Sequence, residues 1–276
     1  QTRVSRYGIM GLSFSLDNVG PLAKTARDCA RVLGVIAGVD PNDATTSNVP
    51  VEDYEAYTLT PDVKGLKIAI PQNYYYDHVT SEVRELLNTS LKKYEELGAH
   101  IVEVSVPDHE KLSDFASVVM GSEAATLHGE WIRERPDDYS DQVLARIQPG
   151  LAYPSTHYLR ALQIRPEITN RFVEEVLGEC DVFHAPVLSF STPTIAESDV
   201  GATQGFADYL SRMSYCTRTI NYLGLPSITV PAGFTSNGLP SSFQLVGRPF
   251  NEGLLFQFAA AFQSVTDWHR QTPSLD

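Results

Sequence analysis

Hydrophobic residues recur along much of the chain at the spacing of amphipathic helices. Between residues 22 and 38 they return every three or four positions, with Pro21 suited to the first turn and Gly38 to the end. Residues 80–97 show the same one-sided pattern. Further stretches with helical spacing, the first of them interrupted by prolines, are 108–177, 206–222 and 252–265.

Short hydrophobic runs lie between these helical stretches and predict β-strands. The strand that follows Gly65 is closed by Pro71, and residues 65–106 have the strand, helix, strand order of a βαβ unit. The predicted strands are 65–71, 100–106, 180–186, 227–231 and 243–246. The stretch 188–205, rich in Ser, Thr, Pro and Gly, is predicted to be a loop. The alternation predicts an α/β fold in which a sheet is covered by helices on both faces.

Charge and cysteine content narrow the class of protein. Among 276 residues, 34 are acidic and 21 are Lys or Arg, for a net charge of -13, and no basic run is present. This balance argues against nucleic-acid binding, which depends on clustered cations. The 3 cysteines, Cys29, Cys180 and Cys216, have no metal-binding spacing and indicate a reducing compartment. With no membrane span or signal-peptide core in view, we expect a cytoplasmic protein.

The sequence contains no self-sufficient active site of a common type. It has no phosphate-binding glycine loop, no Cys-x-x-Cys and no Gly-x-Ser-x-Gly. Cys180 and His184 could form a thiol site, but a strand with one buried thiol is the favoured interpretation. The acidic pairs Asp137-Asp138 and Glu174-Glu175 are adjacent in sequence, so on a helix their members point in different directions. Neither pair resembles a general acid/base couple, so solvated faces are the favoured interpretation, and none of these motifs predicts a metal site.

Two groups of motifs stand near the two ends of the chain. In chain order they are Arg3-Val4-Ser5-Arg6-Tyr7-Gly8, Ser15-Leu16-Asp17-Asn18-Val19-Gly20-Pro21, Ile36-Ala37-Gly38-Val39-Asp40, Asn221-Tyr222-Leu223-Gly224-Leu225-Pro226 and Gln244-Leu245-Val246-Gly247-Arg248-Pro249. Their order, spacing and identity resemble the amidase signature family from residue 1 to about residue 265. The resemblance implies the amidase-signature fold, a mixed β-sheet covered by helices on both faces.

The resemblance also implies a reaction. Members of the family hydrolyse amides with a Ser–cis-Ser–Lys triad, an oxyanion hole of backbone N–H groups and no cofactor. In the family these groups precede the segment that matches Arg3–Gly8, and this chain opens there, at Gln1, without Met. We therefore expect no catalytic residue in the chain. Residues 1–276 are expected to be the C-terminal portion of a single amidase-signature domain, incomplete because the N-terminal part is absent and inactive alone.

What this portion is expected to contribute is a wall of the substrate pocket. In the family, the helix before Gly224-Leu225-Pro226 borders the acyl side of the site, which makes Ser214, Thr217, Arg218 and Asn221 candidate substrate-binding residues. Asn221 is equally well interpreted as a residue that fixes the helix end, and a surface ion pair is favoured for Arg218. His128 lies in a region that approaches substrate in several members, although a satisfied core histidine is the favoured interpretation.

The sequence leaves more than one function open. The leading hypothesis is an amide hydrolase whose partners are a small-molecule amide and the N-terminal part of the same protein, with no nucleic acid and no membrane. One alternative is a non-catalytic binding or assembly subunit that retains the scaffold, and a homo-oligomer is also open. Another is the A-type component of a glutamine amidotransferase. Those components bind glutamine partly through an Asp that would align with Ser214, so its replacement favours a stand-alone hydrolase of small amides.

Overall fold

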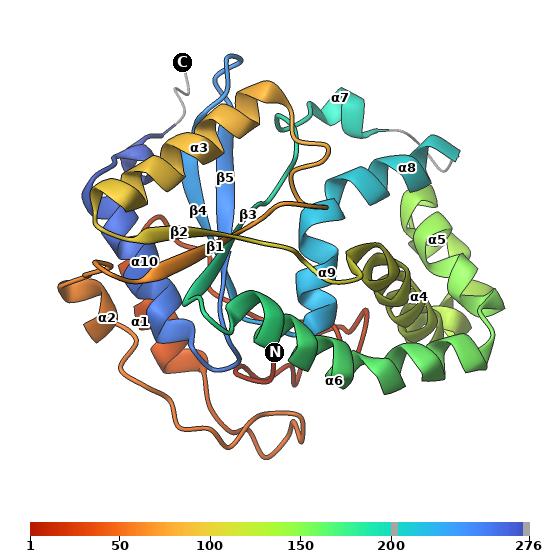
Figure 1. The fold of residues 1–276 in the computed structure, drawn as a ribbon. Coiled ribbons are helices and arrows are strands. Elements are labelled where there is room, and N and C mark those ends of the chain that lie inside the picture. Colours follow the sequence, from red (N-terminus) through yellow and green to blue (C-terminus); the bar gives the residue numbers. More distant parts are fainter. Residues whose placement is uncertain (200–203, 273–276) are drawn as a thin grey trace.

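Five strands form one mixed sheet in the order β2-β1-β3-β5-β4, in a computed structural model that describes residues 1–199 and 204–272 (Figure 1). Their bounds are β1 Lys67–Pro71, β2 His100–Val104, β3 Val182–Pro186, β4 Ser227–Phe234 and β5 Pro240–Val246. β1 pairs in parallel with β2 and β3, whereas β5 runs antiparallel to both β3 and β4. The predicted strands at Gly65 and Ser227 thus belong to the same mixed sheet.

Side chains that alternate along each strand separate two hydrophobic cores. Ile68 and Val182 lie in one core, while their neighbours Ala69 and Phe183 lie in the core on the opposite face of the sheet. This is the period of two expected for a strand that is buried on both faces. The α/β class and the helical cover on both faces are therefore confirmed.

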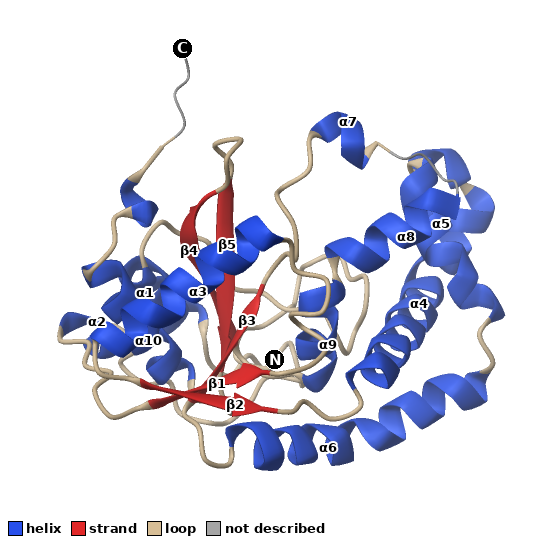
Figure 2. Cartoon of the chain, turned by 45° about the horizontal axis from the view of Figure 1, so that its top comes forward, coloured by secondary structure: helices blue, strands red, loops and turns tan. Residues whose placement is uncertain are grey.

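Helices on the two sides of the sheet form separate groups. On one side are α1 (Ala26–Ile36), α2 (Ala56–Leu59), α3 (Ser81–Glu96) and α10 (Glu252–Ser264). On the other are α4 (His109–Glu134), α5 (Asp141–Ile147), α6 (Ser155–Leu177), α8 (Gln204–Met213) and α9 (Tyr215–Leu223). Figure 2 shows this second group gathered to the right of the sheet. Within the described ranges, no helix combines the length and the apolar character needed to cross a membrane.

The structure refines two of the predicted elements. The predicted helix 206–222 is two helices, because the chain breaks at Ser214, which has φ -103° and ψ 6°. The predicted loop 188–205 contains a short helix, α7 (Ile195–Ser198), whose N-cap Thr194 and Glu197 exchange the two hydrogen bonds of a capping box. Residues 200–203 of that loop lie outside the described residues.

Candidate functional site

One face of α9 carries Ser214, Thr217, Arg218 and Asn221. Positions separated by three, four and seven residues lie on the same side of a helix. The opposite side of α9 is buried against α4, α6 and the sheet. The packing of this apolar side therefore fixes the direction in which the four polar side chains point.

A glycine ends α9 and directs the chain toward β4. Gly224 adopts φ +73°, and its backbone N–H donates to the carbonyl groups of Ile220 and Asn221. A left-handed residue at this position is the usual C-terminal cap, and glycine adopts it without the steric cost of a Cβ. The Gly-Leu-Pro motif that follows thus serves to close the helix that bears the candidate residues.

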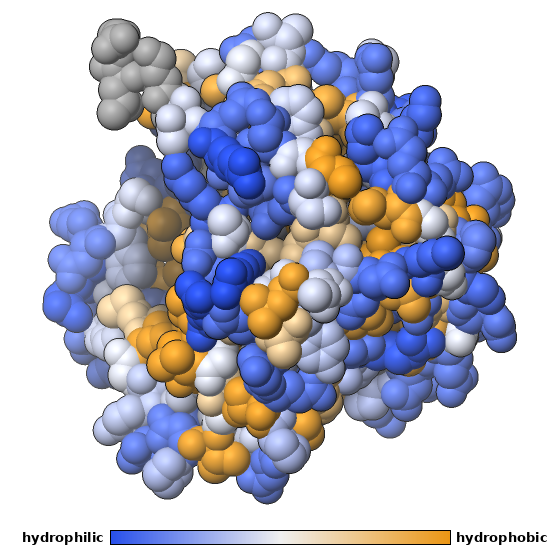
Figure 3. All heavy atoms as spheres, turned by 90° about the vertical axis from the view of Figure 1, so that its left-hand side faces the viewer, coloured by the Kyte–Doolittle hydropathy of each residue, from blue (hydrophilic) through white to orange (hydrophobic). Residues whose placement is uncertain are grey.

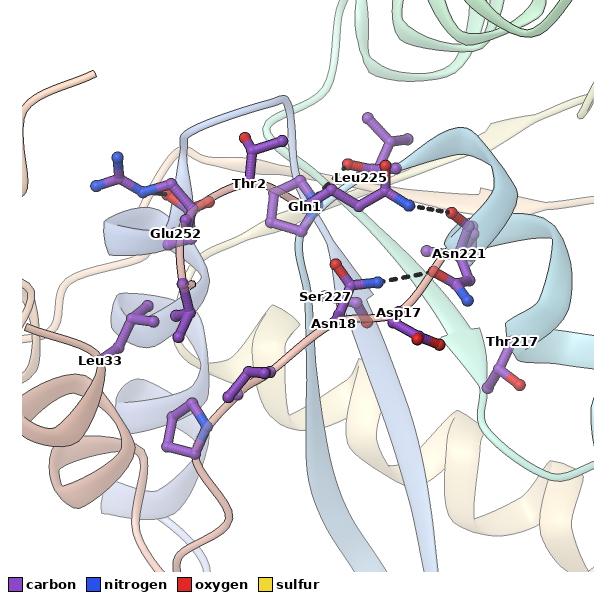
Figure 4. A pocket seen from close by; sticks show the side chains of 18 of the residues that line it. Gln1, Thr2, Asp17, Asn18, Leu33, Thr217, Asn221, Leu225, Ser227 and Glu252 are labelled. Carbon is purple, nitrogen blue, oxygen red and sulfur yellow. Dashed lines mark hydrogen bonds and ion pairs between the residues drawn. The ribbon is translucent and has the colours of Figure 1, made fainter. Parts of the chain in front are cut away.

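Two neighbouring cavities lie on either side of this face. The first, which we call the sheet-side cavity, has a volume of about 400 Å³ and lies between the N-terminal segment, α9 and β4 (Figure 4). The second, the helix-side cavity, has a volume of about 470 Å³ and lies between α4, α5, α8 and α9. Asp17, Thr217 and Asn221 line both cavities, whereas Ser214 and Arg218 line only the second. Volumes of this size suit small-molecule ligands.

A buried carboxylate holds the N-terminal segment against α4. Glu123, which is 1% exposed, accepts hydrogen bonds from the Ser13 hydroxyl, from the Ser15 backbone N–H and hydroxyl at 2.9 and 2.7 Å, and from the Tyr158 hydroxyl at 2.9 Å. These hydrogen bonds replace those that the carboxylate would make with water, which compensates for its burial. These bonds position the two residues that follow, Asp17 and Asn18, at the border between the cavities.

Asn221 joins this segment to α9. The side-chain Nδ2 of Asn18 donates to Oδ1 of Asn221 at 2.9 Å, and Nε2 of Gln1 donates to the Asn221 carbonyl at 3.2 Å (Figure 4). The Asn221 side-chain nitrogen makes no hydrogen bond within the described part of the chain. Asn221 therefore fixes the end of α9, and its side-chain N–H groups remain available at the cavity border. These features agree with both interpretations of the sequence, a residue that fixes the helix end and a candidate substrate-binding residue.

Arg218 crosses from α9 to α4 and does not form the expected surface ion pair. Its Nη1 donates to the hydroxyls of Ser113 and Ser117 at 3.1 and 3.2 Å, and its Nη2 donates to Ser214 Oγ at 2.5 Å and to the Leu210 carbonyl at 3.4 Å. Burial is the largest influence on the guanidinium and lowers its pKa. Each of these four hydrogen-bond acceptors is an uncharged group.

The sheet-side cavity contains a buried carboxylate of its own. Oε2 of Glu252 is buried, receives no hydrogen bond from the described part of the chain, and lies 3.8 Å from Nε of Arg3. Burial raises the pKa of Glu252, because the charged form loses its hydration. Arg3 is itself held by Tyr54 and by the carbonyls of Val49 and Pro50 at 2.8 and 3.1 Å. Arg3 and Glu252 therefore form the charged end of this cavity.

The structure brings together four of the five predicted substrate-binding residues. The fifth, His128, lines neither cavity: its Nδ1 lies 2.8 Å from the Tyr139 hydroxyl and its Nε2 lies 2.8 Å from the Gly11 carbonyl. Both ring nitrogens are thus occupied in a buried position, as in a satisfied core histidine. Sequence reasoning did not select Arg146, which lines the helix-side cavity from α5, because no periodic pattern connects that short helix with α9.

Other candidate chemistry is absent from the described residues. Cys180 is buried, which raises the pKa of its thiol, and His184 contacts Ser90 and Tyr76 instead, so the buried-thiol interpretation is confirmed. No hydrogen bond joins a lysine side chain to a serine within residues 1–199 and 204–272. The same residues include no group of three or more His, Cys, Asp or Glu side chains arranged to hold a metal ion.

Comparison with known proteins gives consistent matches over the whole fold. A protein-family model described as Amidase matches residues 1–256. The A-type component of the glutamyl-tRNA(Gln) amidotransferase of Roseiflexus castenholzii is 36% identical over 298 residues, which cover 99% of this chain and 59% of that protein. The chain thus spans less than two thirds of the length of this relative.

Solved structures agree with the sequence match. The A-type component of the Thermotoga maritima glutamyl-tRNA(Gln) amidotransferase superposes with a TM-score of 0.77 at 30% identity, covering 95% of this chain and 56% of that chain. A second structure, described as an unexpected vestigial protein complex that reveals the evolutionary origins of an s-triazine catabolic enzyme, superposes with a TM-score of 0.83 at 25% identity. That match covers 96% of this chain and 57% of the matched chain.

Proposed function

The chain belongs to the amidase family, and on that premise we propose that the protein which carries it hydrolyses amide bonds. The observation that carries the proposal is the match of the family model to residues 1–256, the part of the chain that contains both cavities. The expected reaction is attack by a serine on the amide carbon, release of ammonia or an amine, and hydrolysis of the acyl-enzyme by water.

In this proposal the chain supplies the pocket and not the nucleophile. Thr217 and Asn221 stand at the border of the two cavities, where their polar groups can orient an amide. The nucleophile, its lysine base and the oxyanion donors belong to polypeptide before Gln1. The lack of a lysine–serine hydrogen bond among the described residues supports this division.

The preceding polypeptide is proposed to complete the same domain along the free edge of β4. Among residues 1–199 and 204–272 only β5 pairs with β4, so one side of β4 presents backbone groups that an added strand can bind. A groove of about 1010 Å³ follows this edge and is lined by apolar residues that include Val230 and Trp268. Leu22, which lines the groove, is 101% exposed, and Figure 3 shows hydrophobic patches on the side of the molecule that carries α1 and α2. Exposed apolar surface of this kind is typical of an interface.

A second candidate function is that of an amidotransferase component of the A type. It is favoured by the 36% identity with a protein of that name. Against it stands Ser214, a neutral residue whose hydroxyl donates to the Leu210 carbonyl at 2.7 Å and accepts from Arg218. A component of this type acts within an assembly, so this candidate predicts a requirement for further subunits.

The decisive experiment measures ammonia release from a panel of small primary amides. The full-length protein is expected to release ammonia without other subunits, whereas residues 1–276 alone are expected to release none. Turnover by residues 1–276 would contradict a nucleophile that lies before Gln1. If the full-length protein hydrolyses only glutamine and only with added subunits, the amidotransferase is favoured. If it hydrolyses no amide under any condition, a non-catalytic scaffold is favoured.

A further inference from the structure

Two consecutive tyrosines in the loop after β1 contact α9 at two points. The Tyr74 hydroxyl donates to the carbonyl of Tyr215, the first residue of α9, at 3.3 Å. The Tyr75 hydroxyl lies 2.9 Å from Oγ1 of Thr219, about one turn farther along the helix. Because the two contacts are separate, together they restrict both the position of α9 and its rotation about its own axis.

The contact between Tyr74 and Tyr215 is reciprocal. In return for the first hydrogen bond, the Tyr215 hydroxyl donates to the Tyr74 carbonyl at 3.2 Å. The two rings stack, with their centroids 4.3 Å apart and their planes inclined by 14°. Stacked aromatic rings stabilise a contact beyond the area that they bury. We call this arrangement, the two hydrogen bonds and the stacked rings of Tyr74 and Tyr215, the tyrosine clamp.

The loop that carries Tyr74 is itself fixed to the sheet. The Asn73 side chain exchanges two hydrogen bonds with the backbone of Val106, just beyond β2, at 3.0 and 2.9 Å. The backbone N–H of Tyr74 donates to Oδ2 of Asp77 at 2.9 Å. Tyr74 has φ +63°, a left-handed conformation that a bulky residue keeps only where surrounding contacts hold it. The tyrosine clamp therefore connects α9 with a fixed loop at the end of the sheet.

The tyrosine clamp lies beside the candidate site and not inside it. Neither Tyr74 nor Tyr215 is among the described residues that line the two cavities. Thr217 and Asn221, which line both cavities, follow Tyr215 by two and six positions on the same helix. Since α9 has 9 residues joined by backbone hydrogen bonds, a displacement of its first residue moves the cavity residues with it.

We propose that Tyr74 and Tyr215 are positioning residues, which hold Thr217 and Asn221 in the orientation that an amide needs. The inference rests on the proposed amide hydrolase and adds to it two residues outside the cavities. Hydrogen bonds weaken steeply with distance and angle, so a small displacement of α9 would weaken those that Thr217 and Asn221 offer an amide. Because the proposed nucleophile lies before Gln1, the expected consequence is weaker binding of the amide and not a slower chemical step.

Phenylalanine variants of the full-length protein test the tyrosine clamp, because each removes one hydroxyl and keeps the ring. We expect Tyr74→Phe and Tyr215→Phe each to raise KM for a small primary amide about 3- to 10-fold, the equivalent of one buried hydrogen bond. The value of kcat should change less than about twofold, as expected when only binding is lost. Either variant alone suffices if the other fails to fold.

The matched control is Tyr94→Phe, on the opposite face of the sheet. The buried Tyr94 hydroxyl donates to the Phe258 carbonyl at 3.1 Å and so joins α3 to α10. This bond is of the same kind as the one that Tyr74 donates, but it does not involve α9. Tyr94→Phe should therefore lower the unfolding midpoint about as much as Tyr74→Phe does, and should leave KM unchanged.

A measurement that needs no turnover separates this inference from the proposed function. In full-length protein labelled at threonine methyl groups, the NMR resonance of the Thr217 methyl should shift in Tyr74→Phe and not in Tyr94→Phe. If no amide is hydrolysed but this shift is observed, the hydrolase is wrong and the positioning role stands. If amides are hydrolysed, while KM and the resonance are unchanged in both clamp variants, the positioning role is wrong and the hydrolase stands. Equal rises of KM in Tyr74→Phe and Tyr94→Phe would show a general loss of stability and would overturn the inference.

Discussion

The hydroxyl groups of Tyr75 and Thr219 lie 2.9 Å apart in the buried core, although 144 residues separate them in sequence. Thr219 is on the side of α9 that faces away from the cavities, between the cavity residues Arg218 and Asn221. The Tyr75 hydroxyl also lies 2.8 Å from Nε2 of His109 at the start of α4. This chain of polar contacts connects the helix that bears the candidate site with the loop after β1 and with α4.

Replacement of Thr219 by valine should loosen that connection without a change in side-chain volume. Tyr75 keeps its contact with His109, so the loss is one buried hydrogen bond, about 1 kcal/mol of unfolding free energy. Denaturant unfolding measures the loss directly. The matched control is Thr126→Val, because Thr126 is exposed on α4 and its hydroxyl donates to the Ser122 carbonyl of its own helix. Equal midpoints for the two variants would contradict a stabilising role for the Tyr75–Thr219 contact.

Replacement of Glu123 by glutamine should disturb the N-terminal segment. The amide nitrogen of glutamine would face either the Ser13 hydroxyl and the Ser15 backbone N–H, which bind Oε2, or the Ser15 and Tyr158 hydroxyls, which bind Oε1. In both orientations two donors lose their acceptor oxygen and the remaining acceptor is no longer charged. We expect a loss of about 2 kcal/mol in unfolding free energy, as for a hydrogen bond to a charged group. The exposed Glu130 on the same helix provides the control, Glu130→Gln, which should not change stability.

The pKa of Tyr158 provides a second measurement on the same variant. Burial first, and then the hydrogen bond to the Glu123 carboxylate, raise the pKa of Tyr158 to about 12. Glutamine removes the charge but leaves the burial. In Glu123→Gln the pKa should therefore fall below its parental value yet stay above the ordinary value of 10.0, which NMR of ring-labelled tyrosine can follow. An unchanged pKa would mean that the carboxylate does not act on Tyr158.

Sequence periodicity predicted the fold because the relevant signals are local. The short hydrophobic runs of β1 and β3 and the helical spacing of α1, α3 and α10 are properties of short segments, and the two cores follow from them. The four candidate residues Ser214, Thr217, Arg218 and Asn221 were selected by the family resemblance and not by periodicity, and the structure places all four at the helix-side cavity. The break between α8 and α9 escaped prediction because Ser214 is neither glycine nor proline.

The partners of those four residues could not be predicted. Arg146 and Asp17 reach the cavity from segments far away in sequence, and only the packing of α4, α5 and the N-terminal segment brings them there. A surface ion pair was the favoured interpretation of Arg218, and the structure gives it serine hydroxyls instead. The hydrogen-bond partners of a side chain depend on tertiary contacts, and the pattern of residues in one sequence does not reveal those contacts.

Two buried histidines should make the stability of the fold sensitive to mild acid. Burial is the largest cause that lowers the pKa of His109 to about 4 and that of His184 to about 3, from an ordinary value of 6.5. Both are neutral in the folded chain, while the unfolded chain binds protons below pH 6.5. Their contribution to stability is therefore complete above that pH and is lost as the pH falls toward 4.

Unfolding free energies measured between pH 6.5 and 5 test this dependence. Each histidine should contribute a slope of up to about 1.4 kcal/mol per pH unit, with stability falling as the pH falls. His109→Gln should reduce the combined slope by about half, whatever its effect on absolute stability. The exposed His157 on α6 serves as the control, and His157→Gln should leave the slope unchanged. A flat profile in the parent protein would contradict neutral burial of both rings.

Alanine substitutions at two glycines can distinguish the free-energy cost of a left-handed backbone from the cost of a steric contact at the end of α9. Gly224 and Gly238 have φ values of +73° and +77°, so alanine at either position pays for a left-handed backbone, roughly 1–2 kcal/mol. Around Gly238 nothing lies within 4 Å of the added Cβ, whereas at Gly224 it would lie 2.9 Å from Oε1 of Gln1 and 3.3 Å from Nη2 of Arg165. Gln1 cannot move away freely, because its Nε2 donates to the Asn221 and Ser15 carbonyls.

Gly224→Ala should thus lower the unfolding free energy of the full-length protein more than Gly238→Ala does. It should also raise KM for amides, since Asn221 lines both cavities. Equal losses in the two variants, with KM unchanged, would show that the contact between Gln1 and the end of α9 does not hold the candidate site in place.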